Sequence, residues 1–353
     1  MAGAPRQAGL GFDADVYPMR HTLAYSDLLL LMGLSYSGFR LIGLNMFSAY
    51  QATLLFFSVI GFAGMSVLLR RGFGCRPVIA ALGGFLFIVN VDLYYQSGHP
   101  QLFSVMLLPW FFFAALRFVE PRSAPSAHRA IAGTGAILLL GGMMLTSFYM
   151  TWGAGFITLI LLLIHAFRLK RSRSWSRVRS ELLVSFASCG RWNWMFAVLA
   201  AGILAFFLWM YVPVVLQFGG RRYRGLFHTL PTVFQLADVT RDNWLWGGLA
   251  KLLLPGAVVD LLSSGNAGVP PILLCCFLGT FFYWRIRSAP GHANPDQGSP
   301  RARSGLWVTG LWLSVCIAWL LMLRFGSVSL WILVFNLVPG ANGLRDLGGC
   351  NWC

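Results

Sequence analysis

The chain has 353 residues, of which 57% are hydrophobic, 15% aromatic and only 11% charged. Ordinary soluble domains carry about 25% charged residues, so this composition excludes a soluble enzyme, a disordered chain, a coiled coil and a secreted disulfide scaffold. The apolar stretches approach the roughly 20 residues that cross a bilayer, and they lack the alternation of a membrane β-barrel. The net charge of +16 is therefore typical of loops that set topology, and we expect no nucleic-acid partner.

The predicted fold class is all-α: a single polytopic transmembrane domain over residues 1–353, with about eight spans. Residues 1–44 contain no span and form an extracytoplasmic segment, in which the apolar run 28–34 predicts an interfacial helix. A long apolar block at 131–167 holds two spans, with a turn at Thr146 to Tyr149. The remaining spans are predicted at about 46–69, 78–91, 102–119 (with Pro109 as a kink), 194–216, 271–284 and 306–323.

Basic residues predict the orientation. The loop at 168–193 is rich in Arg and Lys, and short basic loops lie on the cytoplasmic side. Alternation of the spans then places 17 of the 27 basic residues inside and eight of the 11 acidic residues outside, and it makes 217–268 a large extracytoplasmic loop. Acidic residues contribute little to topology, so their segregation points to a working outer face.

The N-terminal segment offers the first candidates for chemistry. Asp13 and Asp15 are one residue apart, and such a pair of carboxylates serves as a general base or holds a divalent cation. A solvated loop is the alternative interpretation. Asp27 lies at the end of the same segment and is a further site candidate.

Two other outer segments carry polar and basic candidates. Asp92 and His99 lie in the polar connection 90–101, where they would bind a phosphate-bearing ligand, position one another, or cap a helix. The large outer loop begins with three arginines, whose guanidinium groups bind lipid phosphate or anchor to headgroups, and a single cation lies near the last turn. These basic residues are Arg221, Arg222, Arg224 and Arg345.

Several of these residues lie in short motifs through which the chain resembles the GT-C superfamily of polytopic glycosyltransferases, especially the large bacterial membrane proteins of that fold. The resemblance spans about residues 12–346 and consists of short motifs separated by spans. The motifs are Tyr17 to Asp27, Gly98-His99-Pro100-Gln101-Leu102, Leu108-Pro109-Trp110, Ser147-Phe148-Tyr149, Val338-Pro339-Gly340 and Leu344-Arg345.

The resemblance implies a GT-C-like fold in a bacterial inner membrane and a sugar transfer at its outer face. The sugar would pass from a polyprenyl-phosphate donor to an acceptor hydroxyl, with Asp13 or Asp15 as general base. Basic residues would stabilise the departing lipid phosphate, and a divalent cation at the carboxylates is compatible with the pattern but not required. The implied partners are the polyprenyl-phosphate-linked sugar and membrane lipid; Tyr149 is a further site candidate, and the implied phosphate ligands are His99, Arg221, Arg222, Arg224 and Arg345.

The chain departs from the family pattern at both ends, where a first span and a second arginine after Arg345 are missing. We therefore expect a piece of a longer protein. Two alternatives stay open: a transporter or flippase of lipid-linked or anionic solutes, and a non-enzymatic membrane component or fragment. A transporter would need ionisable residues inside its spans, whereas the predicted span cores are apolar apart from His165 near a helix end.

Overall fold

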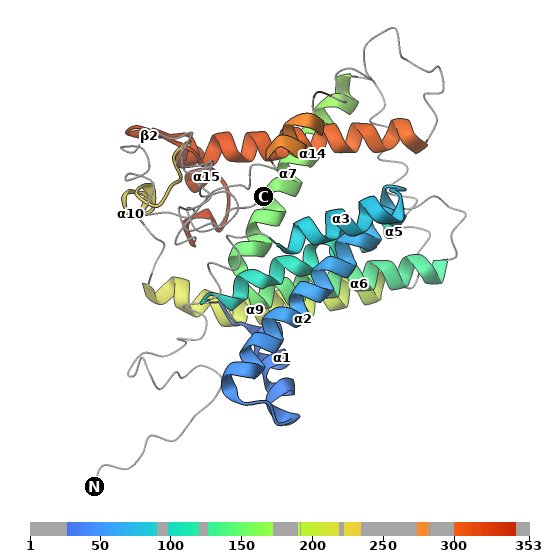
Figure 1. The fold of residues 1–353 in the computed structure, drawn as a ribbon. Coiled ribbons are helices and arrows are strands. Elements are labelled where there is room, and N and C mark those ends of the chain that lie inside the picture. The colour runs from blue at the N-terminus through green and yellow to red at the C-terminus, as the bar shows by residue number, and fades with distance from the viewer. Residues whose placement is uncertain are drawn as a thin grey trace, which may run out of the picture.

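The computed structural model describes residues 27–89, 98–119, 126–171, 190, 192–218, 222–233, 274–280, 282 and 300–343. Within these ranges the chain is almost entirely helical (Figure 1), which confirms the predicted all-α class. One small hairpin pairs β1 (Arg324–Phe325) with β2 (Val328–Ser329). The helices are α1 (Leu30–Leu41), α2 (Met46–Val67), η3 (Leu68–Gly72), α3 (Pro77–Ile88), η4 (Pro100–Leu107), α5 (Leu108–Val119), α6 (Ser126–Thr146), α7 (Phe148–Arg171), α9 (Trp192–Phe218), α10 (Tyr223–Phe227), α14 (Pro300–Met322), α15 (Trp331–Leu337) and η7 (Ala341–Gly343).

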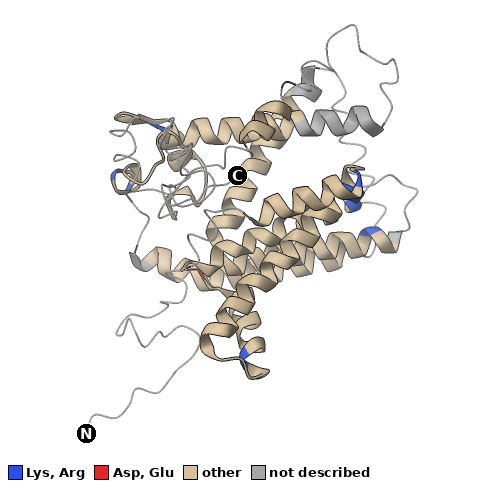
Figure 2. Ribbon diagram, in the orientation of Figure 1, with Lys and Arg blue, Asp and Glu red and all other residues tan. Residues whose placement is uncertain are grey.

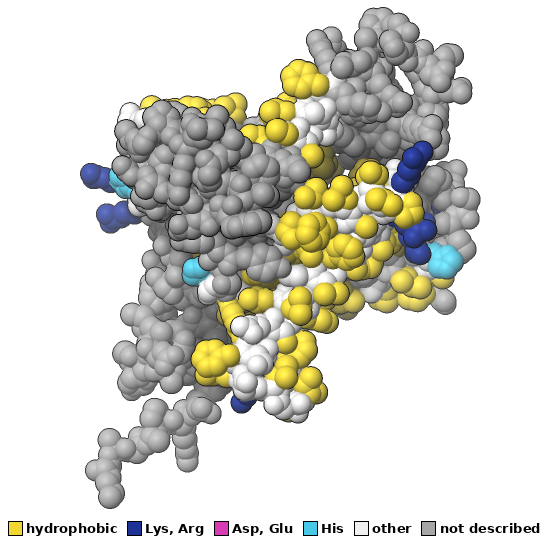
Figure 3. All heavy atoms as spheres, viewed as in Figure 1, with side chains coloured by type: hydrophobic (Ala, Val, Ile, Leu, Met, Phe, Trp, Pro, Cys, Tyr) yellow, Lys and Arg dark blue, Asp and Glu magenta, His cyan; other side chains and the backbone are white. Residues whose placement is uncertain are grey.

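Four helical stretches are long and apolar enough to cross a membrane: Met46–Gly72, Pro100–Phe118, Ala127–Thr146 and Trp194–Leu216. Three shorter apolar helices accompany them, at Pro77–Ile88, Phe148–Ile164 and Thr309–Met322. The chain is accordingly a helical membrane protein, and its apolar side chains cover much of the visible surface (Figure 3). The count of eight spans stays a prediction. In the described residues four predicted spans are long enough and three are shorter apolar helices, and the segment 271–284 is described only at 274–280 and 282.

Small residues allow α2 to pack closely against η4 and α5. A side chain at Gly61 would meet Met106 of η4, and one at Gly64 would meet the indole of Trp110 in α5. The Trp110 Nε1 group donates a hydrogen bond to the Ile60 carbonyl oxygen at 2.9 Å. Close approach of backbones through small residues is the usual way in which membrane helices associate, and here an indole hydrogen bond joins the two helices as well.

Local residue chemistry explains the places of Pro109 and Ser147 in these helices. The 3₁₀ helix η4 ends at Leu107 and α5 begins at Leu108, so Pro109 lies in the first turn of α5, where a missing N–H costs nothing. The apolar block 131–167 divides at Ser147, which separates α6 from α7. The prediction of two spans with a turn between them is confirmed as two helices with a break at this serine.

The helices give the molecule two distinct ends. Arg129 lies in the first turn of α6, and Thr146 lies at its last residue, about 25 Å away at roughly 1.5 Å per residue. The Leu29 N–H donates to the Thr146 carbonyl oxygen at 3.2 Å, which places the start of α1 at this second end. In the ribbon of Figure 2, blue Lys and Arg positions occur where η3 ends and where α6 begins, two places that the predicted alternation of loops assigns to one side. Which end faces the cytoplasm stays a prediction.

Candidate functional site

Half of the predicted site residues lie in the part of the chain that the structure describes. These are Asp27, His99, Tyr149, Arg222 and Arg224. The other half lie outside the described residues, and they are Asp13, Asp15, Asp92, Arg221 and Arg345.

Asp27 is the only acidic residue in the described ranges, and it is 5% exposed. Its Oδ1 atom accepts a hydrogen bond from the Phe148 backbone N–H at 2.8 Å, and its Oδ2 atom accepts one from the Ser147 hydroxyl at 3.2 Å. The start of a helix leaves backbone N–H groups without intrahelical partners and carries a partial positive charge. The Asp27 carboxylate therefore caps α7 from a residue 121 positions away.

The chain that leads into α1 is bonded to the same helix break. Besides the backbone bond from Leu29, the Leu31 N–H donates to the Thr146 hydroxyl at 3.1 Å. The Thr146 hydroxyl itself donates to the Gly142 carbonyl oxygen at 2.7 Å. Backbone polar groups at the start of α1 thus find partners at the junction of α6 and α7, as burial within a membrane protein requires.

The turn after α15 reaches the start of α7 from the other side. Trp152 Nε1 donates a hydrogen bond to the Pro339 carbonyl oxygen at 2.9 Å. Gly340 has a φ of +82°, and a Cβ built on it would lie 3.1 Å from Cζ of Phe148. A Cβ on Gly343 would lie 3.5 Å from the same ring. Three separated motifs of the resemblance therefore meet at Phe148, and Arg345 follows Gly343 by two residues.

His99 and Tyr149 lie at this same end of the molecule. His99 is exposed and directly precedes η4, whose buried Phe103 belongs to the same apolar core as Met150 of α7. Tyr149 is half-buried, with its ring 6.3 Å from the ring of Phe148. The structure therefore brings Asp27 and Tyr149 together at the first turn of α7, and it places His99 at the start of η4, which packs against α7.

Arg222 and Arg224 are exposed on either side of Tyr223, at the start of α10. The Tyr223 ring packs edge-on against Phe335 of α15, with ring centres 5.4 Å apart. Arg324 of β1 joins this group, with its guanidinium 5.6 Å from the centre of the Phe227 ring. Sequence reasoning did not single out Arg324, and the available signal was its place two residues after the apolar helix that ends at Met322.

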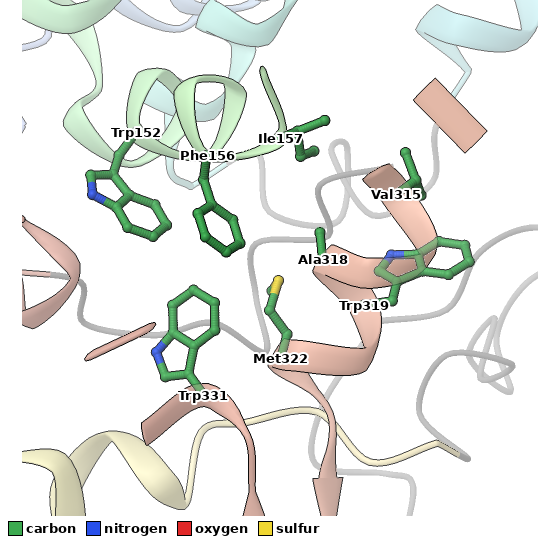
Figure 4. Close-up of a pocket in the computed structure, with 9 residues that line it drawn as sticks. Trp152, Phe156, Ile157, Val315, Ala318, Trp319, Met322 and Trp331 are labelled. Carbon is green, nitrogen blue, oxygen red and sulfur yellow. The ribbon is translucent and has the colours of Figure 1, made fainter. Parts of the chain in front are cut away.

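The hollows between α7 and α14 are apolar. Trp152, Phe156, Met322 and Trp331 line a small cavity (Figure 4). Its volume of about 10 Å³ is room for one water molecule at most. A larger open groove of about 750 Å³ lies between α7, α14 and α15, and all of its lining side chains are aliphatic or aromatic. Neither hollow supplies a group for acid–base chemistry, whereas the groove suits a lipid chain.

Metal ligands do not gather in the described ranges: no group of three His, Cys, Asp or Glu side chains is found there. The predicted divalent-cation site at Asp13 and Asp15 lies outside those ranges. Comparison with known protein families, curated proteins and solved structures finds no match to the chain. The class is therefore defined by the fold alone, as a helical membrane protein whose described residues include four helices long and apolar enough to span a membrane.

Proposed function

We propose that the protein is a membrane glycosyltransferase that moves a sugar from a polyprenyl-phosphate donor to an acceptor hydroxyl on the extracytoplasmic face. The observation that carries the proposal is the convergence at Phe148. Asp27, the Ser147-Phe148-Tyr149 motif and the turn at Pro339 and Gly340 belong to the outline that the chain shares with GT-C enzymes, and they meet at the first turn of α7. Their convergence supports a common working face at this end.

In the proposed reaction, Asp13 or Asp15 takes the proton of the acceptor hydroxyl. The acceptor oxygen bonds to the anomeric carbon of the sugar as the bond to the donor phosphate breaks, and the phosphate leaves with the electron pair. Positively charged groups stabilise that phosphate as its charge develops. Of the predicted phosphate ligands, His99, Arg221 and Arg345 are assigned to the donor phosphate in this proposal.

Asp27 has a different role in this proposal. Its carboxylate is buried and both oxygens accept hydrogen bonds from the α6–α7 break. A carboxylate whose two oxygens are both bonded to the start of a helix is placed to hold that helix. Asp27 therefore positions α7, and Tyr149 with it, rather than accepting the substrate proton.

The membrane setting fits a lipid-linked donor in a bacterial inner membrane. The apolar groove of about 750 Å³ between α7, α14 and α15 offers a surface for the polyprenyl chain. In the four long spans, Asp, Glu, Lys, Arg and His occur only within three residues of the ends. Ionisable side chains within spans mark transport pathways, so these four helices favour an enzyme over the alternative of a transporter or flippase.

A single preparation tests the proposal against its rivals. The full chain is reconstituted in liposomes with radiolabelled polyprenyl-phosphate sugar on one face, and two products are followed. Labelled acceptor at the outer face supports the transferase. Label that crosses the bilayer still attached to the lipid identifies a flippase, and label that neither moves nor transfers identifies a non-enzymatic component.

A further inference from the structure

Basic side chains from two distant parts of the chain form one surface, which we call the α10–hairpin surface. It consists of Arg222, Arg224 and His228 at α10 together with Arg324 of β1. The first three are exposed and Arg324 is half-buried. The one acidic side chain in the described ranges, Asp27, is bonded to the start of α7, so no acidic side chain within those ranges pairs with this surface.

The Phe227 ring organises this surface. The Arg324 guanidinium lies 5.6 Å from its centre, a geometry in which a cation is attracted to the ring face. The His228 ring lies edge-on to it, with centres 5.9 Å apart. The Arg324 backbone is fixed as well, because its N–H donates to the Pro231 carbonyl oxygen at 2.9 Å. The basic groups therefore belong to one packed unit.

Both parts of the surface follow directly after apolar helices. Arg222 comes six residues after Leu216, where a long span ends, and Arg324 comes two residues after Met322. These two helices end near the start of α7, since Tyr211 of α9 lies 6.2 Å from Phe148 between ring centres and Met322 belongs to the core that surrounds Trp331 and Phe156. The surface thus lies where membrane helices leave the bilayer.

Exposed apolar side chains adjoin the charges. Phe325 is 47% exposed, Val328 at the hairpin is 63% exposed, and Val233 after α10 is 47% exposed. Basic groups beside exposed apolar side chains are typical of protein segments that lie in the headgroup region, with apolar groups toward the acyl chains. The space-filling view shows basic side chains with a histidine projecting at one edge of the molecule (Figure 3).

We propose that the α10–hairpin surface binds the phosphate groups of anionic phospholipids in the adjacent leaflet. Guanidinium groups bind phosphate oxygens in pairs of parallel hydrogen bonds and are weakly hydrated, which suits a headgroup layer. The inference goes beyond the proposed function, because it holds whether or not the protein transfers sugar, and it leaves the donor phosphate to His99 and the predicted residues outside the described ranges.

Photocrosslinking tests the inference at the surface itself. The full chain is placed in nanodiscs containing phosphatidylglycerol with a photoactivatable headgroup, and crosslinks to peptides covering 222–233 and 324–330 are quantified by mass spectrometry. Each arginine near an anionic surface contributes about fivefold to binding. We therefore expect the crosslink yield of the triple variant Arg222→Gln, Arg224→Gln, Arg324→Gln to be at least tenfold lower than that of the wild-type protein. Phosphatidylcholine with the same photoactivatable group should give little signal in the wild-type protein.

A matched control removes the same charge at the other end. Arg70, Arg71 and Arg76 are exposed on the connection from η3 to α3, and their change to Gln should leave crosslinks at 222–233 and 324–330 unchanged. The double variant Arg222→Gln, Arg224→Gln replaces only exposed side chains, so it should fold. If the triple variant does not fold, crosslinking of this double variant tests the inference instead. Crosslinking unchanged in the double and triple variants would overturn the inference.

The same discs separate the phospholipid from the donor. Polyprenyl phosphate is added at equal concentration, and phospholipid crosslinks should persist. Their complete displacement by polyprenyl phosphate would overturn the inference and assign the surface to the donor. Transfer activity is read independently in these discs, so a protein that crosslinks phospholipid without transferring sugar defeats the proposed function and leaves this inference standing.

Discussion

The Asp27 carboxylate accepts a hydrogen bond from the Phe148 backbone N–H at 2.8 Å, across 121 residues of sequence. The bond joins the segment before α1 to the first residue of α7, and the Ser147 hydroxyl supplies a second bond to the same carboxylate at 3.2 Å. Hydrogen bonds to a buried charged group each contribute about 1.5–3 kcal/mol. This pair of bonds therefore fixes the N-terminal segment to the end of the molecule where the proposed reaction takes place.

Removal of this cap should destabilise the protein. Asp27→Ala leaves the Phe148 N–H buried without its acceptor, and we expect a loss of about 2–3 kcal/mol in unfolding free energy. Asp27→Asn keeps one carbonyl oxygen as an acceptor and should lose less. Unfolding of the purified protein in mixed detergent, followed by circular dichroism, measures both. Equal stability of Asp27→Ala and the wild-type protein would show that the carboxylate does not hold α7.

The turn at Gly340 offers a second test with two internal controls. Gly340→Ala combines a φ of +82° with a Cβ 3.1 Å from the Phe148 ring, and we expect a loss of about 2 kcal/mol or more. Gly326 has a φ of +60° with nothing within 4 Å of a built Cβ, so Gly326→Ala measures backbone strain alone, at about 1 kcal/mol.

Gly343→Ala completes the set, since its Cβ would make an ordinary contact of 3.5 Å with the same ring. We expect it to change the unfolding free energy least. We expect the loss of stability to be largest for Gly340→Ala, intermediate for Gly326→Ala and smallest for Gly343→Ala. Thermal unfolding in detergent measures this order. A loss for Gly343→Ala as large as that for Gly340→Ala would contradict the described position of this turn.

Two glycine-to-alanine substitutions should shift the melting temperature in opposite directions, one at the contact between α2 and α5 and one on α1, where a Cβ has free space. A Cβ at Gly64 would lie 2.6 Å from the Trp110 ring, so Gly64→Ala must displace the indole that donates to the Ile60 carbonyl oxygen. A Cβ at Gly33 of α1 meets nothing within 4 Å. Ala is favoured over Gly in a helix by about 1 kcal/mol, so Gly33→Ala should raise the melting temperature and Gly64→Ala should lower it. Shifts of the same sign in both variants would refute this packing.

Local features of the fold were predictable because their causes are local. Continuous apolar stretches predict helices of membrane length, and the polar residues at Thr146 and Ser147 predict the break between α6 and α7. Built Cβ atoms at Gly141 and Gly142 meet Ile203 and Leu31, so these two glycines allow close packing against α6.

Long-range relationships were not predictable from the sequence. In the sequence, Asp27 is indistinguishable from other carboxylates in loops. Its bond to Phe148 joins residues 121 positions apart, and hydrophobic periodicity does not predict such a contact. Arg324 likewise joins Arg222 and Arg224 only because the hairpin after α14 folds beside α10, where its backbone bonds to Pro231. Spacing along the chain identifies polar residues near span ends, but packing alone decides which of them meet.

The measurement that tests the central claim most directly is sugar transfer by variants of the two predicted base residues. Asp13→Asn, Asp15→Asn and the double variant are compared with the wild-type protein in liposomes supplied with radiolabelled polyprenyl-phosphate sugar. General base catalysis contributes about 10²–10⁴-fold to rate, so we expect transfer to fall by at least 100-fold in one single variant and in the double variant, with unfolding temperature unchanged. Transfer at the wild-type rate in the double variant would contradict the account.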